Sequence, residues 1–203
     1  MTALWQHIGR IYAPPIYTAA SGFADMTTHT SDSDLFWIRQ LPADALDGER
    51  KSVLRCLLDA VPFASVMEVG STALGDVVGK QDLDFAVRVS AHEFKRARYA
   101  LDSLFQRNSN QLSNSEYQGY VVASPFDVAV QLFVAGGEHD TFERFVVVLR
   151  ARPDLRRAYN TLKHEWNGRA MIGYRLAKQA FIESALKESQ PPGLAAVQTT
   201  VKS

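Results

Sequence analysis

The chain has 203 residues, of which 46% are hydrophobic, so it can bury one substantial core and is most simply a single domain. Lysine plus arginine equal aspartate plus glutamate at 22 each, so net charge indicates neither a nucleic acid nor a membrane surface as partner. The single cysteine, Cys56, cannot form an internal disulfide, and no apolar run approaches the ~20 residues that span a bilayer, so we expect a cytoplasmic protein.

The two ends of the chain differ in composition from the middle. Residues 1–33 are rich in Thr, Ser, Ala and Pro without a clear period, which predicts a flexible extension, and Met26 within it is an alternative start. Residues 189–203 contain Pro191-Pro192-Gly193 and few core-forming residues, which predicts a flexible tail. The domain itself is therefore expected over residues 34–188.

The first half of the domain alternates helical and extended patterns. Apolar spacing predicts a helix over residues 48–60, a strand over 66–70 and a short helix over 71–78. A strand is predicted over 83–89, and a helix over 91–106. The residues expected to face inward on that last helix are Phe94, Ala97, Leu101, Leu104 and Phe105.

The second half begins with two strands and ends in helices. Ser124-Pro125 separates residues 117–123 from residues 126–134, and both segments alternate as strands of a hairpin do. Helices are predicted over the remainder, at residues 140–151, 153–168 and 172–188. The expected class is α/β (α+β), a small mixed sheet flanked by helices with a C-terminal helical segment.

A glycine-serine turn stands shortly before two closely spaced acids. Gly70 lets backbone approach a phosphate, and Ser71 and Thr72 offer hydroxyls and amides at the start of the predicted short helix, where an anion is favoured. Asp82 and Asp84 alternate with apolar residues, so both carboxylates leave the same face of a strand. Two such acids repel unless a cation lies between them, and Mg²⁺ or Mn²⁺ with a nucleoside triphosphate meets that need.

These residues resemble the signature of the nucleotidyltransferase superfamily. Within it, the chain is similar to the GrpB family over roughly residues 50 to 186, through Gly70-Ser71-Thr72-Ala73, Lys80, Val130 to Val134 and the distal segment from Leu149 to Phe181. The resemblance implies a nucleotidyltransferase-like fold. Glu68 stands where the family usually has His, and Gln81 where it usually has Pro.

Asp127 is the candidate for the third acid that the nucleotidyltransferase mechanism uses. It precedes the strand over residues 128–134 and is a candidate general base or an additional metal ligand, which would make Asp82, Asp84 and Asp127 both catalytic and metal-binding. The alternative is that Asp127 only begins a strand after the turn, as Asp often does.

Two Tyr-x-x-x-Lys units follow in the helical region. Tyr159 with Lys163, and Tyr174 with Lys178, each lie on one helix face, where a lysine could neutralise phosphate charge and a tyrosine stack on a base. Residues 139–188 hold ten Lys or Arg against six Asp or Glu, which suits an anion. Lys80 is a further candidate phosphate contact. The alternative is that the tyrosines pack at the core edge while the lysines extend into water.

The favoured function is transfer of a nucleoside monophosphate from a triphosphate to an acceptor hydroxyl that the sequence does not identify. Two other classes stay open. One is a nucleotide- or phosphometabolite-binding module without turnover, and the other is a protein- or RNA-modifying nucleotidyltransferase of the toxin–antitoxin type. Candidate nucleotide-binding residues are Gly70, Ser71, Thr72, Lys80, Tyr159, Lys163, Tyr174 and Lys178.

Overall fold

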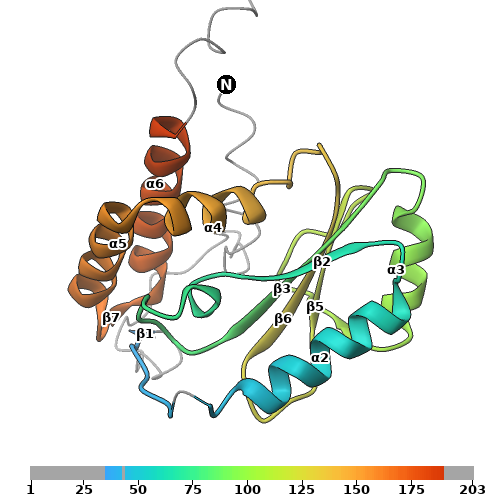
Figure 1. Ribbon diagram of the computed structural model, residues 1–203, viewed down its shortest axis with the longest axis horizontal. Coiled ribbons are helices and arrows are strands. Elements are labelled where there is room, and N and C mark those ends of the chain that lie inside the picture. The colour runs from blue at the N-terminus through green and yellow to red at the C-terminus, as the bar shows by residue number, and fades with distance from the viewer. Residues whose placement is uncertain (1–34, 43, 190–203) are drawn as a thin grey trace, which may run out of the picture.

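The computed structural model describes residues 35–42 and 44–189. Within these ranges a five-stranded mixed sheet lies between two groups of helices, as the ribbon in Figure 1 shows. The expected mixed α/β class is therefore confirmed. The predicted extension over residues 1–33 and all but the first residue of the predicted tail lie outside the described residues.

The large sheet has the strand order β2-β3-β6-β5-β4. Its strands are β2 (Ser65–Val69), β3 (Leu83–Val89), β6 (Val128–Val134), β5 (Tyr117–Val121) and β4 (Gln106–Arg107). Strand β3 is antiparallel to β2 and parallel to β6, and β6 is antiparallel to β5. The predicted hairpin of β5 and β6 is confirmed, and the parallel pairing places the start of β6 beside the start of β3.

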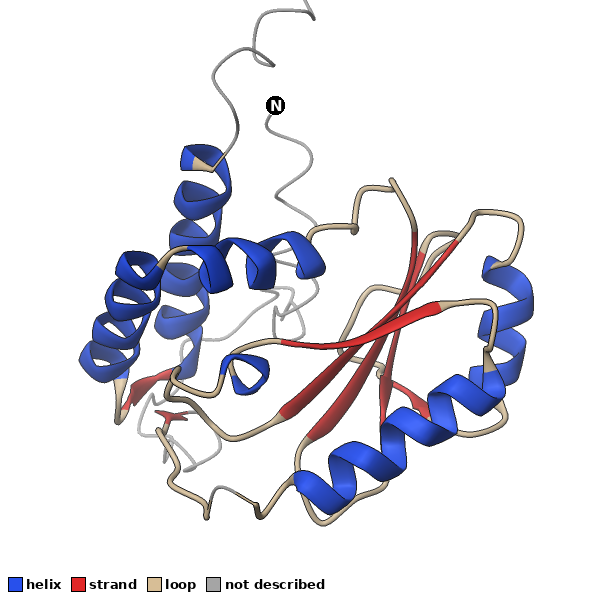
Figure 2. Ribbon diagram, viewed as in Figure 1, coloured by secondary structure: helices blue, strands red, loops and turns tan. Residues whose placement is uncertain are grey.

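One face of the sheet carries the main hydrophobic core. Strand β3 alternates, and Leu83, Phe85, Val87 and Val89 all enter this core. Helices α2 (Asp47–Ala60) and α3 (Phe94–Asp102) cover it, and Figure 2 shows both on the same side of the strands. This packing fixes the pleat of β3, so the intervening residues must point to the opposite face.

The opposite face is only partly covered, by the C-terminal helices α4 (Phe142–Ala151), α5 (Pro153–Trp166) and α6 (Met171–Glu188). Phe142 and Val146 of α4 pack against Val69 and Ala86 of the sheet. A small sheet of β1 (Leu35–Phe36) and β7 (Arg169–Ala170) joins the start of the described chain to the start of α6. The beginnings of β3 and β6 extend beyond α4 and border two cavities described below.

Two predicted elements differ from the structure. The short helix expected over residues 71–78 is a single 3-10 turn, η2 (Thr72–Leu74), which ends where Gly75 adopts a φ of 70°. The loop that follows is held by α5 instead, because Asn160 accepts a hydrogen bond from Val78 N and donates one to Asp76 O. The helix expected over residues 91–106 ends at Asp102, so Leu104, expected inward, is 47% exposed.

Candidate active site

The paired acids meet at the start of β3. Asp84 lies within the strand, and Asp82 precedes it with its side chain 30% exposed. Burial, reinforced by the nearby charge of Asp82, raises the pKa of the Asp84 carboxyl to about 7, although Lys178, Lys80 and Lys163 oppose that shift. Ionising both acids of the expected pair is therefore unfavourable, and three lysine side chains nearby reduce that cost.

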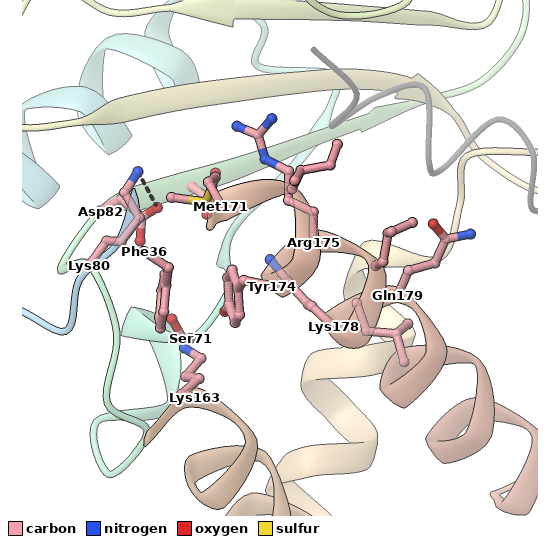
Figure 3. Close-up of a pocket in the computed structure, with 14 residues that line it drawn as sticks. Phe36, Ser71, Lys80, Asp82, Lys163, Met171, Tyr174, Arg175, Lys178 and Gln179 are labelled. Atoms are coloured by element: carbon pink, nitrogen blue, oxygen red, sulfur yellow. Dashed lines mark ion pairs between the residues drawn. The ribbon is translucent and has the colours of Figure 1, made fainter. Parts of the chain in front are cut away.

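A cavity of about 210 Å³ lies between this strand end and helix α6. Figure 3 shows Tyr174, Arg175 and Lys178 on one helix facing Lys80 and Asp82, and apolar side chains such as Phe36 and Met171 line the cavity between these charged groups. The residues lining it are Phe36, Ser71, Lys80, Asp82, Asp84, Lys163, Met171, Ile172, Tyr174, Arg175, Leu176, Lys178, Gln179 and Ile182. Such a cavity suits a ligand with one anionic and one apolar part.

Gly70 allows both the turn after β2 and the close approach of the Asp84 carboxylate. Its φ is 78°, and a Cβ added there would lie 2.7 Å from Asp84 Oδ2. The predicted role of a helix N-terminus at Ser71 and Thr72 needs correction, because η2 has only three residues. Ser71 nevertheless lines the cavity, whereas Thr72 does not.

The lysines take different positions around the acids. Lys80 Nζ lies 3.9 Å from Asp82 Oδ2 and 3.6 Å from Asp127 Oδ2, between the two carboxylates. Lys163 is 1% exposed and donates a 2.5 Å hydrogen bond to Val78 O, and burial lowers its pKa to about 7. Lys163 therefore anchors the loop after η2 as well as lining the cavity, while Lys178 extends from α6 into the cavity (Figure 3).

The two tyrosines are buried. Tyr159 is 2% exposed and packs against Phe145 and Phe181, with ring centroids 5.6 and 5.1 Å away. The expectation that its ring stacks on a base is therefore not supported. Tyr174 stacks on Phe36 with centroids 3.7 Å apart, and its hydroxyl is hydrogen-bonded to that of Tyr159. Tyr174 does line the cavity, but the Phe36 ring occupies one of its faces.

Asp127 lies beside Asp82 without joining a three-acid cluster. Its backbone oxygen accepts a 2.9 Å hydrogen bond from Leu83 N, and its half-exposed carboxylate pairs with Lys80 and, at 3.8 Å, with Arg39. Among residues 35–42 and 44–189, no group of three His, Cys, Asp or Glu side chains could hold a metal ion. The predicted triad is thus not gathered as three metal ligands.

The donor set nevertheless fits a hard divalent cation. Mg²⁺ commonly takes one or two protein carboxylates and completes its shell with phosphate oxygens and water, and Asp82 and Asp84 offer such a pair. The ammonium of Lys80 already lies between Asp82 and Asp127, so positive charge is favoured at this strand end. Burial and the charge of Asp82 together raise the pKa of Asp84, and a cation here would favour the ionised carboxylate against both.

Sequence reasoning missed several residues of the cavity wall, above all Phe36, Met171 and Arg175. Met171, Arg175 and Lys178 recur at helical spacing, which places them on one face of α6 with Tyr174. That spacing was a usable signal for the two residues on α6. The sequence carries no such signal for Phe36, because only the pairing of β1 with β7 brings it to Tyr174.

Comparison with known proteins identifies relatives over most of the described residues. A family model described as GrpB protein matches residues 43–188. A UPF0157 protein of Vibrio cholerae is 35% identical over 130 residues, covering 64% of this chain and 69% of the relative. The crystal structure of the conserved protein GrpB from Enterococcus faecalis aligns with a TM-score of 0.51 and 19% identity, over 76% of this chain and 96% of that one.

A weaker likeness extends to the RNA terminal uridylyl transferase Cid1, with a TM-score of 0.44 and 14% identity. It covers 63% of this chain and 39% of that protein, and we draw nothing from it.

No helix in the described part of the chain is long and apolar enough to cross a membrane.

The close approach of Gly70 to Asp84 predicts a difference between two glycines with similar backbone. Gly136 has a φ of 73° but open space where a Cβ would stand, so Gly136→Ala should cost only the left-handed backbone penalty of ~1–2 kcal/mol. Gly70→Ala should lower the free energy of unfolding by roughly 1 kcal/mol more, because the carboxylate must also move. Urea denaturation measures both, and equal losses would show that Asp84 moves aside without cost.

The raised pKa of Asp84 predicts a pH-dependent stability in the presence of chelator. Folding favours the protonated carboxyl, so this contribution is present near pH 4 and is lost as the pH rises through about 7. Asp84→Asn should therefore be more stable than wild type at pH 8, by about 1–3 kcal/mol, with the difference shrinking as the pH falls to 4.

Thermal denaturation from pH 4 to pH 8 measures this difference. Gly136→Ala is the control, because it lowers stability while keeping every carboxyl and should retain the wild-type pH slope. A difference between Asp84→Asn and wild type that does not change with pH would contradict the prediction.

Proposed function

The chain belongs to the GrpB protein family, and we propose that it transfers a nucleoside monophosphate from a Mg²⁺-bound triphosphate to an acceptor hydroxyl. The observation that carries the proposal is the carboxylate pair Asp82 and Asp84 at one wall of a cavity whose other wall supplies Lys178 and Arg175. Anionic ligands for a metal and cationic ligands for phosphate thus face each other across one space, as a metal-bound triphosphate requires.

The cavity divides into two parts that match the two parts of a nucleotide. Lys178, Arg175 and Ser71 line the cavity and can donate hydrogen bonds to phosphate oxygens, the first two from basic side chains. Met171 and Ile172 form an apolar wall for the base. Because the Tyr159 ring is packed against Phe145 and Phe181, we assign base contact to these aliphatic side chains.

Asp82 and Asp84 would hold the metal, which when bound would neutralise charge that builds up on the phosphate oxygens. Without a metal, the ammonium of Lys80 partly neutralises the Asp82 carboxylate. Lys163, held by Val78 O, keeps the loop that carries Lys80 close to α5. The start of β3 is therefore arranged to bind a metal ion and a triphosphate together, through Asp82, Asp84, Lys80 and Lys163.

The transfer itself joins two substrates at Asp84, which lines the first cavity and a second one beyond the strand. The acceptor oxygen forms a bond to the α-phosphorus, and the bond from that phosphorus to the bridging oxygen breaks. Pyrophosphate leaves with the bonding electrons. The acceptor's proton passes to Asp127, whose half-exposed carboxylate lines the second cavity.

One observation favours a second candidate, a nucleotide-binding module without turnover. The three acids do not form a group that could hold a metal ion in the described residues. Release of pyrophosphate from a bound triphosphate distinguishes the two candidates, because a binding module retains the triphosphate intact. Labelled-nucleotide transfer into small molecules, RNA or protein then separates the classes of acceptor.

The facing charges predict metal-assisted binding. Calorimetry with a non-hydrolysable ATP analogue should show tighter binding with Mg²⁺ than with chelator, and Asp84→Ala should abolish that difference. Lys178→Met should weaken binding tenfold or more, because a charge-assisted hydrogen bond is worth ~1.5–3 kcal/mol. Lys187→Met, an exposed change in the last turn of the same helix, should have no effect. Affinity that is independent of metal in both wild type and Asp84→Ala would end the proposal.

The position of Asp127 predicts an effect on turnover. Asp127→Asn keeps the shape of the side chain but removes its charge, so pyrophosphate release should fall by about 10² while triphosphate affinity changes little. Asp59→Asn, an exposed change on α2, is the control. Turnover of Asp127→Asn within a few-fold of wild type would make Asp127 a residue that only begins β6.

A further inference from the structure

A second cavity of about 590 Å³ also borders the acid pair. It shares Lys80, Asp82, Asp84 and Arg175 with the first cavity and extends along the starts of β3 and β6 toward the segment between β4 and β5. We name it the amide groove, because Asn108, Asn110, Gln111 and Gln131 line it. The two cavities therefore meet at the carboxylates and differ beyond them.

The amide of Gln131 has an unmet hydrogen-bonding need in this groove. Gln131 is 1% exposed, and its Oε1 accepts a hydrogen bond from the Tyr117 hydroxyl, but its Nε2 has no partner in the structure. A buried donor without a partner costs ~1–3 kcal/mol, so the sheet bears that cost beside Asp84. A ligand oxygen in the groove would supply the missing acceptor.

Gly119 leaves the space that the Gln111 side chain occupies against β5. A Cβ at Gly119 would lie 1.7 Å from Gln111 Oε1, so only a glycine in β5 lets this side chain lie against the strand. Gln111 Oε1 is also 3.4 Å from the Tyr117 hydroxyl that Gln131 uses. Two amides that line the groove thus converge on one buried hydroxyl.

The charge of the groove indicates the kind of ligand. Its cations, Lys80 and Arg175, belong to the end shared with the first cavity, and the remaining polar wall is neutral apart from the acids. A nucleic-acid backbone needs cations along its path, which this wall does not provide. Amides both donate and accept, which matches ligand hydroxyls that do the same.

We propose that the amide groove binds the acceptor substrate and that this acceptor is a neutral polyhydroxylated small molecule, a sugar or cyclitol. The proposal rests on the nucleotidyl transfer proposed above, in which the nucleophile is a hydroxyl. Gln111 and Gln131 hold neighbouring hydroxyls, and one hydroxyl of the ligand faces Asp127 and Asp84. Its oxygen bonds to the α-phosphorus, its proton passes to Asp127, and pyrophosphate leaves.

The test measures binding directly, so it does not depend on turnover. The full chain, with Mg²⁺ and a non-hydrolysable ATP analogue, is titrated with methyl glucoside, myo-inositol and sucrose, and separately with an RNA hexamer, with saturation-transfer NMR as the readout. At least one polyol should bind saturably. Gln111→Leu should weaken it about fivefold, the value of one hydrogen bond. Gly119→Ala should do the same, because its Cβ takes the place of Gln111 Oε1.

The control is Gly48→Ala, a glycine on α2 with open space around its Cβ position, and it should change nothing. Three results would overturn the proposal: no polyol binds a chain that holds the triphosphate, the RNA hexamer binds there instead, or Gln111→Leu and Gly119→Ala bind polyol as wild type does. A polyol that binds without nucleotide and is lost in Gln111→Leu would support the groove even if the triphosphate fails to bind, which would contradict only the transfer.

Discussion

The burial of the Asp84 carboxyl beside a second acid, Asp82, is the constraint around which the rest of the site is arranged. A buried carboxylate beside a second one is unfavourable, and the charges of lysines from three separate segments offset part of that cost. Lys80 precedes the strand, Lys163 comes from α5 and Lys178 from α6. The C-terminal helices thus contribute electrostatics as much as packing, because their lysines make it possible to keep two acids at the end of a core strand.

The pairing of β3 with β6 decides which residues can meet there. Because the strands are parallel and in register from Leu83 with Val128, the residues that begin both strands emerge at one edge of the sheet. Here the space is divided by the acids into an α6 side, with cations and aliphatic side chains, and a β5 side, with amides.

Local patterns predicted the parts of the fold that depend on local physics. Alternation over residues 83–89 gave the bounds of β3 as the structure has them, and the GrpB resemblance drawn from Gly70-Ser71 and the distal helices is confirmed by the family match. The prediction of a helix over residues 71–78 was wrong because tertiary hydrogen bonds with Asn160 hold that loop in another conformation. Helical spacing could not tell that Tyr159 packs against Phe145 and Phe181, since those contacts join three separate helices. The amide groove could not be predicted from local spacing either, because the residues that line it come from separate segments of the chain.

The stacking of Phe36 on Tyr174 has a consequence for where the functional unit begins. The family match starts at residue 43, yet one wall of the first cavity is a ring that lies upstream of it, fastened by the pairing of β1 with β7 at the base of α6. A fragment trimmed to the shared family region would keep the sheet, the acids and every lysine discussed above. It would lose the ring that stacks on Tyr174, so one wall of the first cavity depends on a short strand outside the shared family region.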